Sequence, residues 1–399
     1  MNKKVYLKSW GCQMNVRDSE VICGLLKKED FVLINEPENA DVVIFNTCSV
    51  RQHAEEKVWS EIGRYKARGP SLSLRTNHAR KKIIGVIGCM AQNYKDEIFR
   101  RAPQVDFVVG PSDIHKIPEI IKSVSARRYT LSAQDLFETK IWETDGGFRP
   151  EEIYHTGYYQ DKEHAFVVIS EGCSNFCSYC VVPYVRGALR NRSCKDILKE
   201  IEEAIDKGIT KITLLGQNVN SYESPGHQVT RSPVRFVELL KLVNGTKGLK
   251  EFSFITSHPK DTSLDLFRAM GDCEKLKKYL HLPVQSGSDK ILKLMNRGYI
   301  RKFYLDLLEN YRKIVRNGVL TTDIIVGFPT ESEADFQDTY NLIKEIQFDA
   351  AYIFKYSPRP NTEALKYADD VTREEKEKRH KLTLDLQKEI SRSKAVNDK

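Results

Sequence analysis

The sequence predicts an α/β protein in two parts, a parallel sheet with crossover helices followed by an incomplete β/α barrel. Two observations support this prediction. Short apolar strand patterns alternate with amphipathic helical patterns through most of the 399 residues, which is typical of parallel sheets. The alternation is lost between residues 126 and 160, where Gly and Pro interrupt it, so we place the boundary between the two parts there.

Composition and charge fit a globular protein of the cytoplasm. Hydrophobic residues make up 40% and charged residues 30% of the chain, and its length suits two or three domains. We find neither an apolar run of about 18 residues that could cross a membrane nor a secretory signal. The nine cysteines are then expected to serve metals or catalysis rather than disulfides. The net charge of +8 mildly favours a polyanionic partner.

Three cysteines of the first part follow predicted strands. Strand patterns cover 4–9, 41–46, 82–87 and 106–109, and helical patterns cover 17–28, 52–67, 93–101 and 113–123. Cys12 comes after the first strand, Cys48 after the second and Cys89 after the third. Parallel strands end at one edge of a sheet, where open sheets bind ligands. This arrangement therefore predicts a site that is formed by three thiolates.

Three more cysteines lie in one short loop at the start of the second part. Cys173, Cys177 and Cys180 follow the apolar strand pattern at 165–170. Iron–sulfur clusters normally take four thiolates, so three at C-x3-C-x2-C spacing predict a cluster with one iron left open for a substrate. A zinc site is the alternative. Zinc favours four ligands in pairs, however, and no second pair follows here.

Six strand-and-helix repeats predict the barrel. Strand patterns cover 165–170, 211–215, 251–255, 279–284, 320–326 and 350–354, and helical patterns cover 195–207, 234–242, 263–270, 288–295, 302–316 and 333–347. Active sites of β/α barrels lie on the loops that follow the strands. Besides the cysteines, those loops hold polar or glycine-rich stretches at 216–218, 256–259, 285–288, 327–329 and 355–358. Each stretch alone could be a helix cap or a tight turn, but their shared location predicts a ligand site.

Five further residues allow a functional or a structural interpretation. His258 and His281 could be acid or base groups, although a histidine near a strand end is often a structural hydrogen-bond donor. Cys23, Cys194 and Cys273 lie in or beside helical patterns, and we interpret them as buried apolar side chains.

The motifs resemble those of the radical S-adenosylmethionine (SAM) methylthiotransferases. The resemblance runs from Gly-Cys-Gln-Met-Asn at 11–15 to Arg-Pro at 359–360, which is nearly the whole chain. Within the family, several short stretches of the sequence are similar to those of the branch that modifies isopentenylated adenosine in tRNA. The stretches that carry this finer similarity are 13–15, 46–51, 215–221 and 280–288.

The resemblance implies how the chain is divided and which cofactors it carries. A flavodoxin-like domain at 1–143 would hold an auxiliary [4Fe–4S] cluster on the three strand-end cysteines. A linker at 144–160 would lead to the radical SAM domain at 161–370, a partial (β/α)6 barrel of the TIM type with the second [4Fe–4S] cluster on the loop cysteines. The charged helical stretch at 371–399 would lead to a small β-barrel RNA-binding domain called TRAM, which we expect this chain to lack.

The resemblance also implies the reaction, which is the addition of a methylthio group to carbon-2 of isopentenylated (dimethylallyl) adenosine beside the anticodon. One SAM would be cleaved to a 5′-deoxyadenosyl radical that takes hydrogen from this carbon, and a second SAM would methylate the sulfur. Carbon-2 is unactivated, so side chains alone could not do this chemistry. The expected partners are a tRNA anticodon stem-loop and an external one-electron reductant of the flavodoxin or ferredoxin type, and we expect a monomer.

Three other functions remain open. Sister enzymes of this family act on threonylcarbamoyl-adenosine in tRNA or on an aspartate of a ribosomal protein. A chain with two clusters could also be an electron carrier without enzymatic activity.

Position at the strand ends and the resemblance together predict which residues contact SAM and the substrate. For SAM we expect Tyr179 near the adenine, residues of the 216–218 stretch near the amino group and residues of the 285–288 stretch near the ribose, namely Gly216, Gln217, Asn218, Gln285 and Ser286. For the substrate we expect His258 and phosphate contacts from the basic stretches at 64–82 and 186–192, the latter through Arg186, Arg190 and Arg192. A solvated basic surface is the alternative for the arginines.

Three positions depart from the family pattern. Leu189 stands where the family has a glutamate. The replacement of this glutamate removes a negative charge near the SAM cluster. Thr330 and Asn361 stand where the family has glycines. Asn tolerates a positive φ almost as glycine does, whereas Thr tolerates it poorly.

Overall fold

The computed structural model describes residues 3–49, 52–65, 82–130, 140–144, 147, 149–224 and 233–397. Most of the basic stretch expected at 64–82 lies outside the described residues. The chain forms two compact units: unit 1 comprises Met1–Lys162 and Tyr184–Gly187, and unit 2 comprises Glu163–Pro183 and Ala188–Lys399.

Unit 1 is built on a parallel sheet with the strand order β2-β1-β3-β4-β5-β6. Its strands are β1 (Lys4–Trp10), β2 (Val32–Leu33), β3 (Val42–Thr47), β4 (Ile83–Gly88), β5 (Phe107–Val109) and β6 (Ile141–Glu143). Every residue of β3 and β4 is buried, as expected of parallel strands that are covered on both faces. The order reverses at β1, as in flavodoxin-like folds, and this confirms the predicted fold class.

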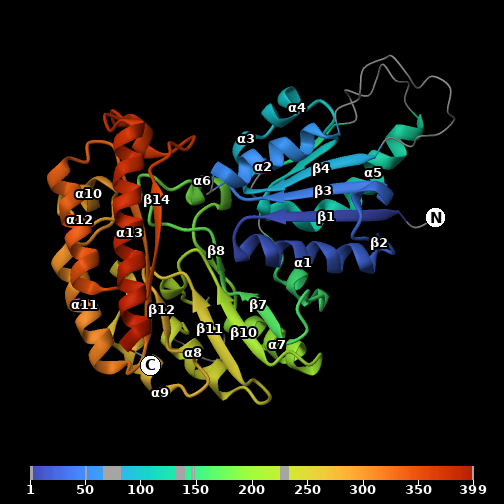
Figure 1. The fold of residues 1–399 in the computed structure, drawn as a ribbon. Coiled ribbons are helices and arrows are strands. Elements are labelled where there is room, and N and C mark those ends of the chain that lie inside the picture. Colours follow the sequence, from blue (N-terminus) through green and yellow to red (C-terminus); the bar gives the residue numbers. More distant parts are fainter. Residues whose placement is uncertain are drawn as a thin grey trace. The chain divides into compact units, whose positions relative to one another are not determined.

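Helices cover both faces of this sheet, with α1 on one face and α2 to α4 on the other (Figure 1). The helices are α1 (Gln13–Lys28), η1 (Pro37–Asn39), α2 (Gln52–Gly63), α3 (Cys89–Tyr94), α4 (Glu97–Arg101), η2 (Pro111–Lys116), α5 (Ile117–Thr130) and η4 (Glu151–Thr156). The predicted helix at 93–101 is instead two helices, because Lys95 adopts a left-handed φ of +48°. Helix α1 begins directly after Cys12, earlier than predicted.

Residues 149–160, which we expected to belong to a linker, pack against α1 within unit 1. The side chain of Arg17 donates to the carbonyl of Tyr154 over 2.9 Å, and the Gln160 N–H donates to Glu20 over the same distance. Tyr154 itself is buried. The sequence did not reveal this packing because the segment has no strand or helix period.

Unit 2 contains two three-stranded parallel sheets, in the orders β7-β10-β11 and β12-β13-β14. The strands are β7 (His164–Val168), β10 (Lys211–Leu215), β11 (Glu251–Ile255), β12 (Tyr279–His281), β13 (Val319–Val326) and β14 (Ala350–Lys355). A parallel bridge pairs Phe252 of β11 with Leu276, which lies just before β12. This confirms the predicted partial barrel. A short antiparallel pair, β8 (Ser170–Glu171) with β9 (Arg190–Asn191), was not predicted.

The helices of unit 2 follow the strands, and α11 to α13 lie outside β12 to β14 in Figure 1. They are α6 (Val182–Arg186, shared with unit 1), α7 (Cys194–Asp206), η5 (Val219–Ser221), α8 (Phe236–Gly245), η6 (Pro259–Asp261), α9 (Leu264–Asp272), α10 (Asp289–Leu294), α11 (Arg301–Ile314), α12 (Glu333–Ile346), η7 (Glu363–Lys366) and α13 (Arg373–Asn397). Serine side chains cap four of them, at Ser193, Ser263, Ser288 and Ser332. Within the described part of the chain, no helix has an apolar run long enough to span a bilayer.

Candidate metal centres

The three cysteines of unit 1 lie at the carboxyl ends of neighbouring strands. Cys12 follows β1, Cys48 follows β3 and Cys89 opens α3 after β4. Gly11 and Gly88 come directly before two of them, with φ of +138° and +88°. A Cβ atom on Gly11 would lie 2.4 Å from the Cys48 Cβ, and one on Gly88 would lie 2.7 Å from the Thr47 carbonyl oxygen. Only glycine fits where these strand ends approach each other so closely.

A buried arginine lies against this cysteine set. The Arg186 Nε donates to the Cys89 Sγ over 3.3 Å, and its terminal nitrogen donates to Asp18 over 2.8 Å. Arg149 donates to the other oxygen of the same carboxylate over 2.8 Å. All three charged side chains are buried. In this structure the guanidinium of Arg186 is held inside unit 1, and its expected phosphate contact stays a prediction.

Two of the thiols have shifted pKa values. A hydrogen bond with Cys48 and the charge of Arg186 lower the pKa of Cys12 to about 6, against the opposing effect of burial. Burial raises the pKa of Cys89, and Arg186 offsets part of this effect. The positive charge of Arg186 favours thiolates at this edge, as metal binding requires.

In unit 2 the cysteine loop is held in place by the residues at the end of α10. The Ser178 Oγ donates to the Leu294 carbonyl over 2.7 Å, and the Ser178 N–H donates to the Met295 carbonyl over 3.1 Å. The Asn296 side chain donates to the Phe176 carbonyl over 3.0 Å. These bonds fix both the middle of the loop and its exposed tip. The loop therefore has a defined conformation from which Cys173, Cys177 and Cys180 project.

Arg297 is the buried arginine of this second set. One terminal nitrogen donates to the Cys177 Sγ and to the Tyr179 hydroxyl, each over 3.3 Å. Burial raises the pKa of Cys173 and raises that of Cys180 to about 12, while the positive charge of Arg297 lowers both. No sequence pattern singles out Arg297, since it lies in a loop after a helix rather than after a strand.

His258 lies next to Cys177 of the same loop and is buried. Its Nδ1 accepts a hydrogen bond from the Lys260 N–H over 3.2 Å, and its Nε2 lies 4.0 Å from the Cys177 Sγ. Burial, with the charges of Arg297 and Lys260, lowers the pKa of His258 to about 2. Burial therefore favours the neutral ring, and the expected contact of His258 with the substrate stays a prediction.

Several polar atoms at the strand ends of unit 2 lack a hydrogen-bond partner among the described residues. They are the Oγ atoms of Ser170 and Ser257 and the Oδ1 of Asn218, and all three are buried. The Asn218 amide nitrogen is fixed by Ser221 and Asp261, which leaves its oxygen available. A Cβ atom on Gly216 would lie 2.5 Å from the Ser170 Oγ. Unsatisfied buried polar atoms are costly, so they suit a polar ligand that would bond them.

The other predicted SAM contacts differ in where their side chains lie. Ser286 is fully buried, and its hydroxyl bonds Thr339 over 3.2 Å. Its expected contact with the ribose stays a prediction. Gln285 has a φ of +75° and is buried, while Gln217 is partly exposed. The Tyr179 ring packs against an apolar cluster at α10 and β13.

The basic stretch after the loop is also more buried than predicted. Arg192 is buried and forms ion pairs with Asp196 and Glu200. Its expected phosphate contact stays a prediction. Arg190 is partly exposed, with one nitrogen 3.5 Å from the Glu171 carboxylate.

The two positions at which the family has glycine do adopt positive φ. The values are +67° at Thr330 and +65° at Asn361. The Thr330 Oγ1 is buried and has no partner among the described residues. Thr330 therefore carries backbone strain that Asn361 largely avoids.

Both cysteine sets have features that suit iron–sulfur clusters. Among the described residues, no three Cys, His, Asp or Glu side chains meet in the geometry of one bound metal ion. A cubane cluster binds each thiolate at a different iron, so its cysteines need not point at one centre. Each set supplies three thiols and a guanidinium that donates to one of them. The second set also has the unpaired polar atoms that a SAM molecule would engage.

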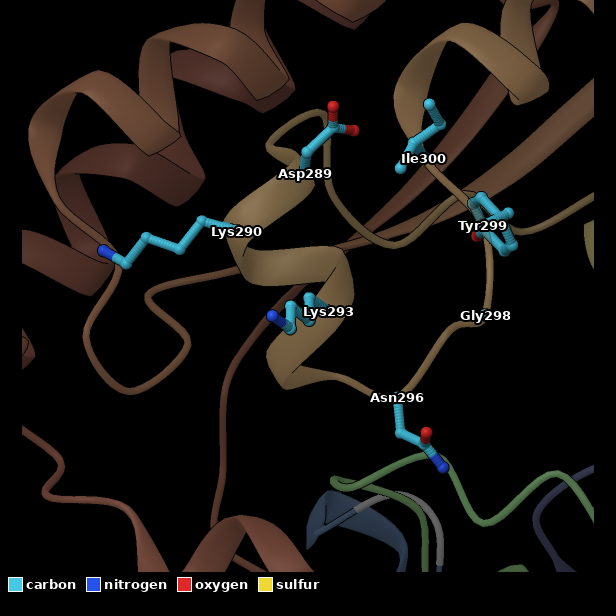
Figure 2. A pocket seen from close by; sticks show the side chains of 7 residues that line it. All are labelled: Asp289, Lys290, Lys293, Asn296, Gly298, Tyr299 and Ile300. Atoms are coloured by element: carbon cyan, nitrogen blue, oxygen red, sulfur yellow. The ribbon is translucent and has the colours of Figure 1, made fainter.

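An open depression of about 570 Å³ lies beside α10, but it is not a cysteine site. Figure 2 shows its lining residues, which come from α10 and the segment after it: Asp289, Lys290, Lys293, Asn296, Gly298, Tyr299 and Ile300. None of the six cysteines lines it. Its exposed lysines make it a solvated surface feature.

Two family models match the chain, one on each unit. "Uncharacterized protein family UPF0004" matches residues 4–110, and "Radical SAM superfamily" matches residues 167–343. The first match covers the three strand-end cysteines, and the second covers the cysteine loop.

Curated relatives match over the whole chain. A tRNA-2-methylthio-N(6)-dimethylallyladenosine synthase of Clostridium botulinum is 43% identical over 98% of this chain and 82% of the relative. A synthase of the same name from Syntrophus aciditrophicus is 39% identical over 100% of this chain and 82% of the relative.

Solved structures support the fold. The radical SAM methyltransferase TsrM from Kitasatospora setae matches with a TM-score of 0.59 at 12% identity, over 91% of this chain and 77% of the other. The cobalamin-dependent SAM radical enzyme OxsB matches with a TM-score of 0.56 at 13% identity, over 94% of this chain and 56% of the other. Identities this low show the fold alone. The sequence matches show more: the chain belongs to the tRNA-2-methylthio-N(6)-dimethylallyladenosine synthase family of radical SAM methylthiotransferases, which use two [4Fe–4S] clusters and SAM.

Proposed function

We propose that this protein adds a methylthio group to carbon-2 of dimethylallyl-adenosine beside the anticodon of tRNA. The observation that carries the proposal is the pair of cysteine sets at strand ends, in a chain that is 43% identical to a synthase named for this product. The tRNA anticodon stem-loop is the substrate, and an external one-electron reductant supplies electrons.

We assign one cluster to each cysteine set. Cys12, Cys48 and Cys89 hold the auxiliary cluster in unit 1, and the three loop cysteines hold the radical SAM cluster in unit 2. The division into a domain for each cluster follows from this assignment. It is supported by the position of every strand-end cysteine at the edge where open sheets bind ligands.

The reaction needs chemistry that side chains lack, since carbon-2 of adenine is unactivated. When bound, the two clusters and SAM supply the radical and the sulfur for this step. The chain's own residues would bind these groups and orient them. Arg186 and Arg297 each place a guanidinium against one thiolate, and Ser178 anchors the cysteine loop to the end of α10.

For SAM, the binding groups of unit 2 are the buried polar atoms without partners at its strand ends. Asn218 offers its Oδ1 as an acceptor, while Ser170 and Ser257 offer hydroxyls. Gly216 leaves room for a ligand next to Ser170, since a side chain there would meet the serine hydroxyl. We therefore retain Gly216, Gln217 and Asn218 as SAM contacts.

The test is turnover on three competing substrates under anaerobic conditions. The protein, reconstituted with iron and sulfide, is incubated with SAM, dithionite and one of three substrates: a dimethylallyl-adenosine stem-loop, a threonylcarbamoyl-adenosine stem-loop or ribosomal protein. Mass spectrometry of the products should show methylthiolation of the dimethylallyl stem-loop alone, with release of 5′-deoxyadenosine.

Each other outcome identifies a different function. A product on the threonylcarbamoyl stem-loop or on the ribosomal aspartate would assign the chain to a sister activity. Complete absence of 5′-deoxyadenosine with both clusters in place would favour an electron carrier. Cys177→Ala serves as the control that should make neither 5′-deoxyadenosine nor methylthio product.

A further inference from the structure

Arg297 is a buried cation that has no anionic partner among the described residues. Its side chain is 4% exposed overall, and its donors go to the Pro283 carbonyl, the Tyr299 hydroxyl, the Tyr179 hydroxyl and the Cys177 Sγ. No described carboxylate lies within ion-pair distance of it. A guanidinium stays protonated in proteins, so burying one with only neutral partners is costly.

Other buried arginines of unit 2 are paired with carboxylates, which offsets the cost of burying their charge. Arg379 is 5% exposed and donates to the Glu331 carboxylate over 2.8 Å, and Arg192 is paired with Asp196 and Glu200. Arg297 has no such partner among the described residues, so a negative charge that binds beside it would be favoured. The sulfur it contacts belongs to Cys177, the buried cysteine of the loop.

We infer that Arg297 is a positioning residue that provides the counter-charge of the radical SAM cluster through the Cys177 thiolate. Charge and hydrogen bonds at the sulfur atoms set the reduction potential of an iron–sulfur cluster. Reduction adds negative charge, so a fixed cation 3.3 Å from a ligating sulfur makes reduction easier. Arg297 also donates to Tyr179, so the same guanidinium fixes the ring of a loop residue.

This inference depends on the proposed cluster on the loop cysteines, and it predicts a property of that cluster rather than its existence. The variants are Arg297→Gln, which keeps donors but loses the charge, and Arg297→Lys, which keeps the charge but loses the planar fork. Arg379→Gln is the matched control, since it removes a buried guanidinium of the same unit that donates to Glu331 and Glu375.

The experiment measures the midpoint potential of the loop cluster by EPR-monitored titration in chains that also carry Cys48→Ala, so that the auxiliary cluster does not interfere. We expect a shift to more negative potential in Arg297→Gln, restoration of most of that shift in Arg297→Lys and no shift in Arg379→Gln. Loss of iron from Arg297→Gln to a chelator should be roughly tenfold faster, because a neutral donor to the sulfur replaces a charged one.

An unchanged midpoint potential in an Arg297→Gln protein that holds the cluster would overturn the inference. Equal shifts in the Gln and Lys variants would also overturn it, because the shape of the guanidinium and not its charge would then set the potential. If Arg297→Gln does not hold a cluster, the midpoint potential of Arg297→Lys tests the inference. A potential near that of the parent chain supports the inference, and a large negative shift contradicts it. If the parent chain itself holds no cluster on the loop, the proposed function fails instead.

Discussion

The two cysteine centres use the same contact in different electrostatic settings. Each has one buried arginine whose nitrogen lies 3.3 Å from a cysteine sulfur. In unit 1 that arginine and Arg149 share the Asp18 carboxylate, which offsets one of their two positive charges. In unit 2 the corresponding Arg297 has no carboxylate among the described residues. Unit 1 therefore gives its arginine a carboxylate partner on folding, whereas in unit 2 the proposed cluster is the partner that we infer for Arg297.

The two centres also differ in how the chain brings their cysteines together. Those of unit 1 come from three strand ends that are distant in sequence, so the site exists only when the sheet is formed. Those of unit 2 lie within one loop. Changes that weaken the sheet should therefore damage the first centre while the second persists.

The largest expected effect is on SAM cleavage. Cys177→Ala should abolish release of 5′-deoxyadenosine, because it removes a ligand of the cluster that binds SAM. Cys48→Ala should leave most of the cleavage intact, because it affects the other cluster. Chromatography of 5′-deoxyadenosine after anaerobic incubation with dithionite measures both. Loss of cleavage in both variants would contradict the separation of roles.

A large loss of stability is expected from Asp18→Asn, which leaves Arg149 and Arg186 buried without their carboxylate. Breaking a buried ion pair in this way costs about 3–5 kcal/mol. Urea unfolding of the full chain, followed by circular dichroism, measures it. Asp385→Asn, which removes an exposed helix pair with Lys381, should change stability by no more than about 0.5 kcal/mol.

The same carboxylate predicts a pH dependence. Burial alone would raise the pKa of Asp18, but Arg149 and Arg186 outweigh it and hold the pKa below its usual value. A depressed pKa in the folded state contributes stability above the unfolded pKa, about 3.9, and that contribution is lost as the pH falls further. The stability difference between the parent chain and Asp18→Asn should therefore shrink below about pH 4. A difference that stayed constant from pH 6 to pH 3 would show that the Asp18 charge contributes nothing.

A moderate effect is expected from Gly88→Ala in unit 1. The added Cβ would lie 2.7 Å from the Thr47 carbonyl oxygen, and the φ of +88° does not suit alanine. Strain of this kind costs about 1–3 kcal/mol, and its relief should displace Cys89. Iron bound by the auxiliary site should fall, while SAM cleavage by unit 2 should persist. Gly147→Ala, where an added Cβ meets nothing within 4 Å, is the control.

The smallest expected effect is a gain in stability in unit 2. Thr330→Gly removes a β-branched residue at a φ of +67° and should stabilise the folded chain by about 1 kcal/mol, after the entropy cost of glycine is subtracted. Asn361→Gly, at a φ of +65°, should change stability by less, because Asn already tolerates this region. Thermal unfolding of both variants tests the contrast. Equal changes would indicate that Thr330 is not strained.

The sequence predicted the fold class because it follows from local patterns. Strand β10 has the predicted limits, 211–215, and β11 has the predicted limits, 251–255. The family resemblance also identified Thr330 and Asn361 as positions at which φ turns out to be positive. These features depend on spacing and residue type, which can be read directly from the sequence.

The charged residues could not be placed in the same way. Arg186 and Arg192 form part of a basic stretch in the sequence, but their guanidinium groups are buried against carboxylates. Asp18 lies on α1, far from Arg186 along the chain, so no local pattern indicates this ion pair. Arg297 was missed for the same reason, since its contact with Cys177 depends on how α10 packs against the cysteine loop.

The central claim is that two separate cysteine sets each hold one [4Fe–4S] cluster. The most direct measurement is iron and sulfide per chain, with Mössbauer spectra, in the reconstituted parent protein, in Cys48→Ala and in Cys177→Ala. The account predicts that the parent holds two clusters and that each variant holds about half as much iron, with different spectral components missing in the two variants. Iron content that is unchanged in Cys48→Ala, or lost completely in either single variant, would contradict it.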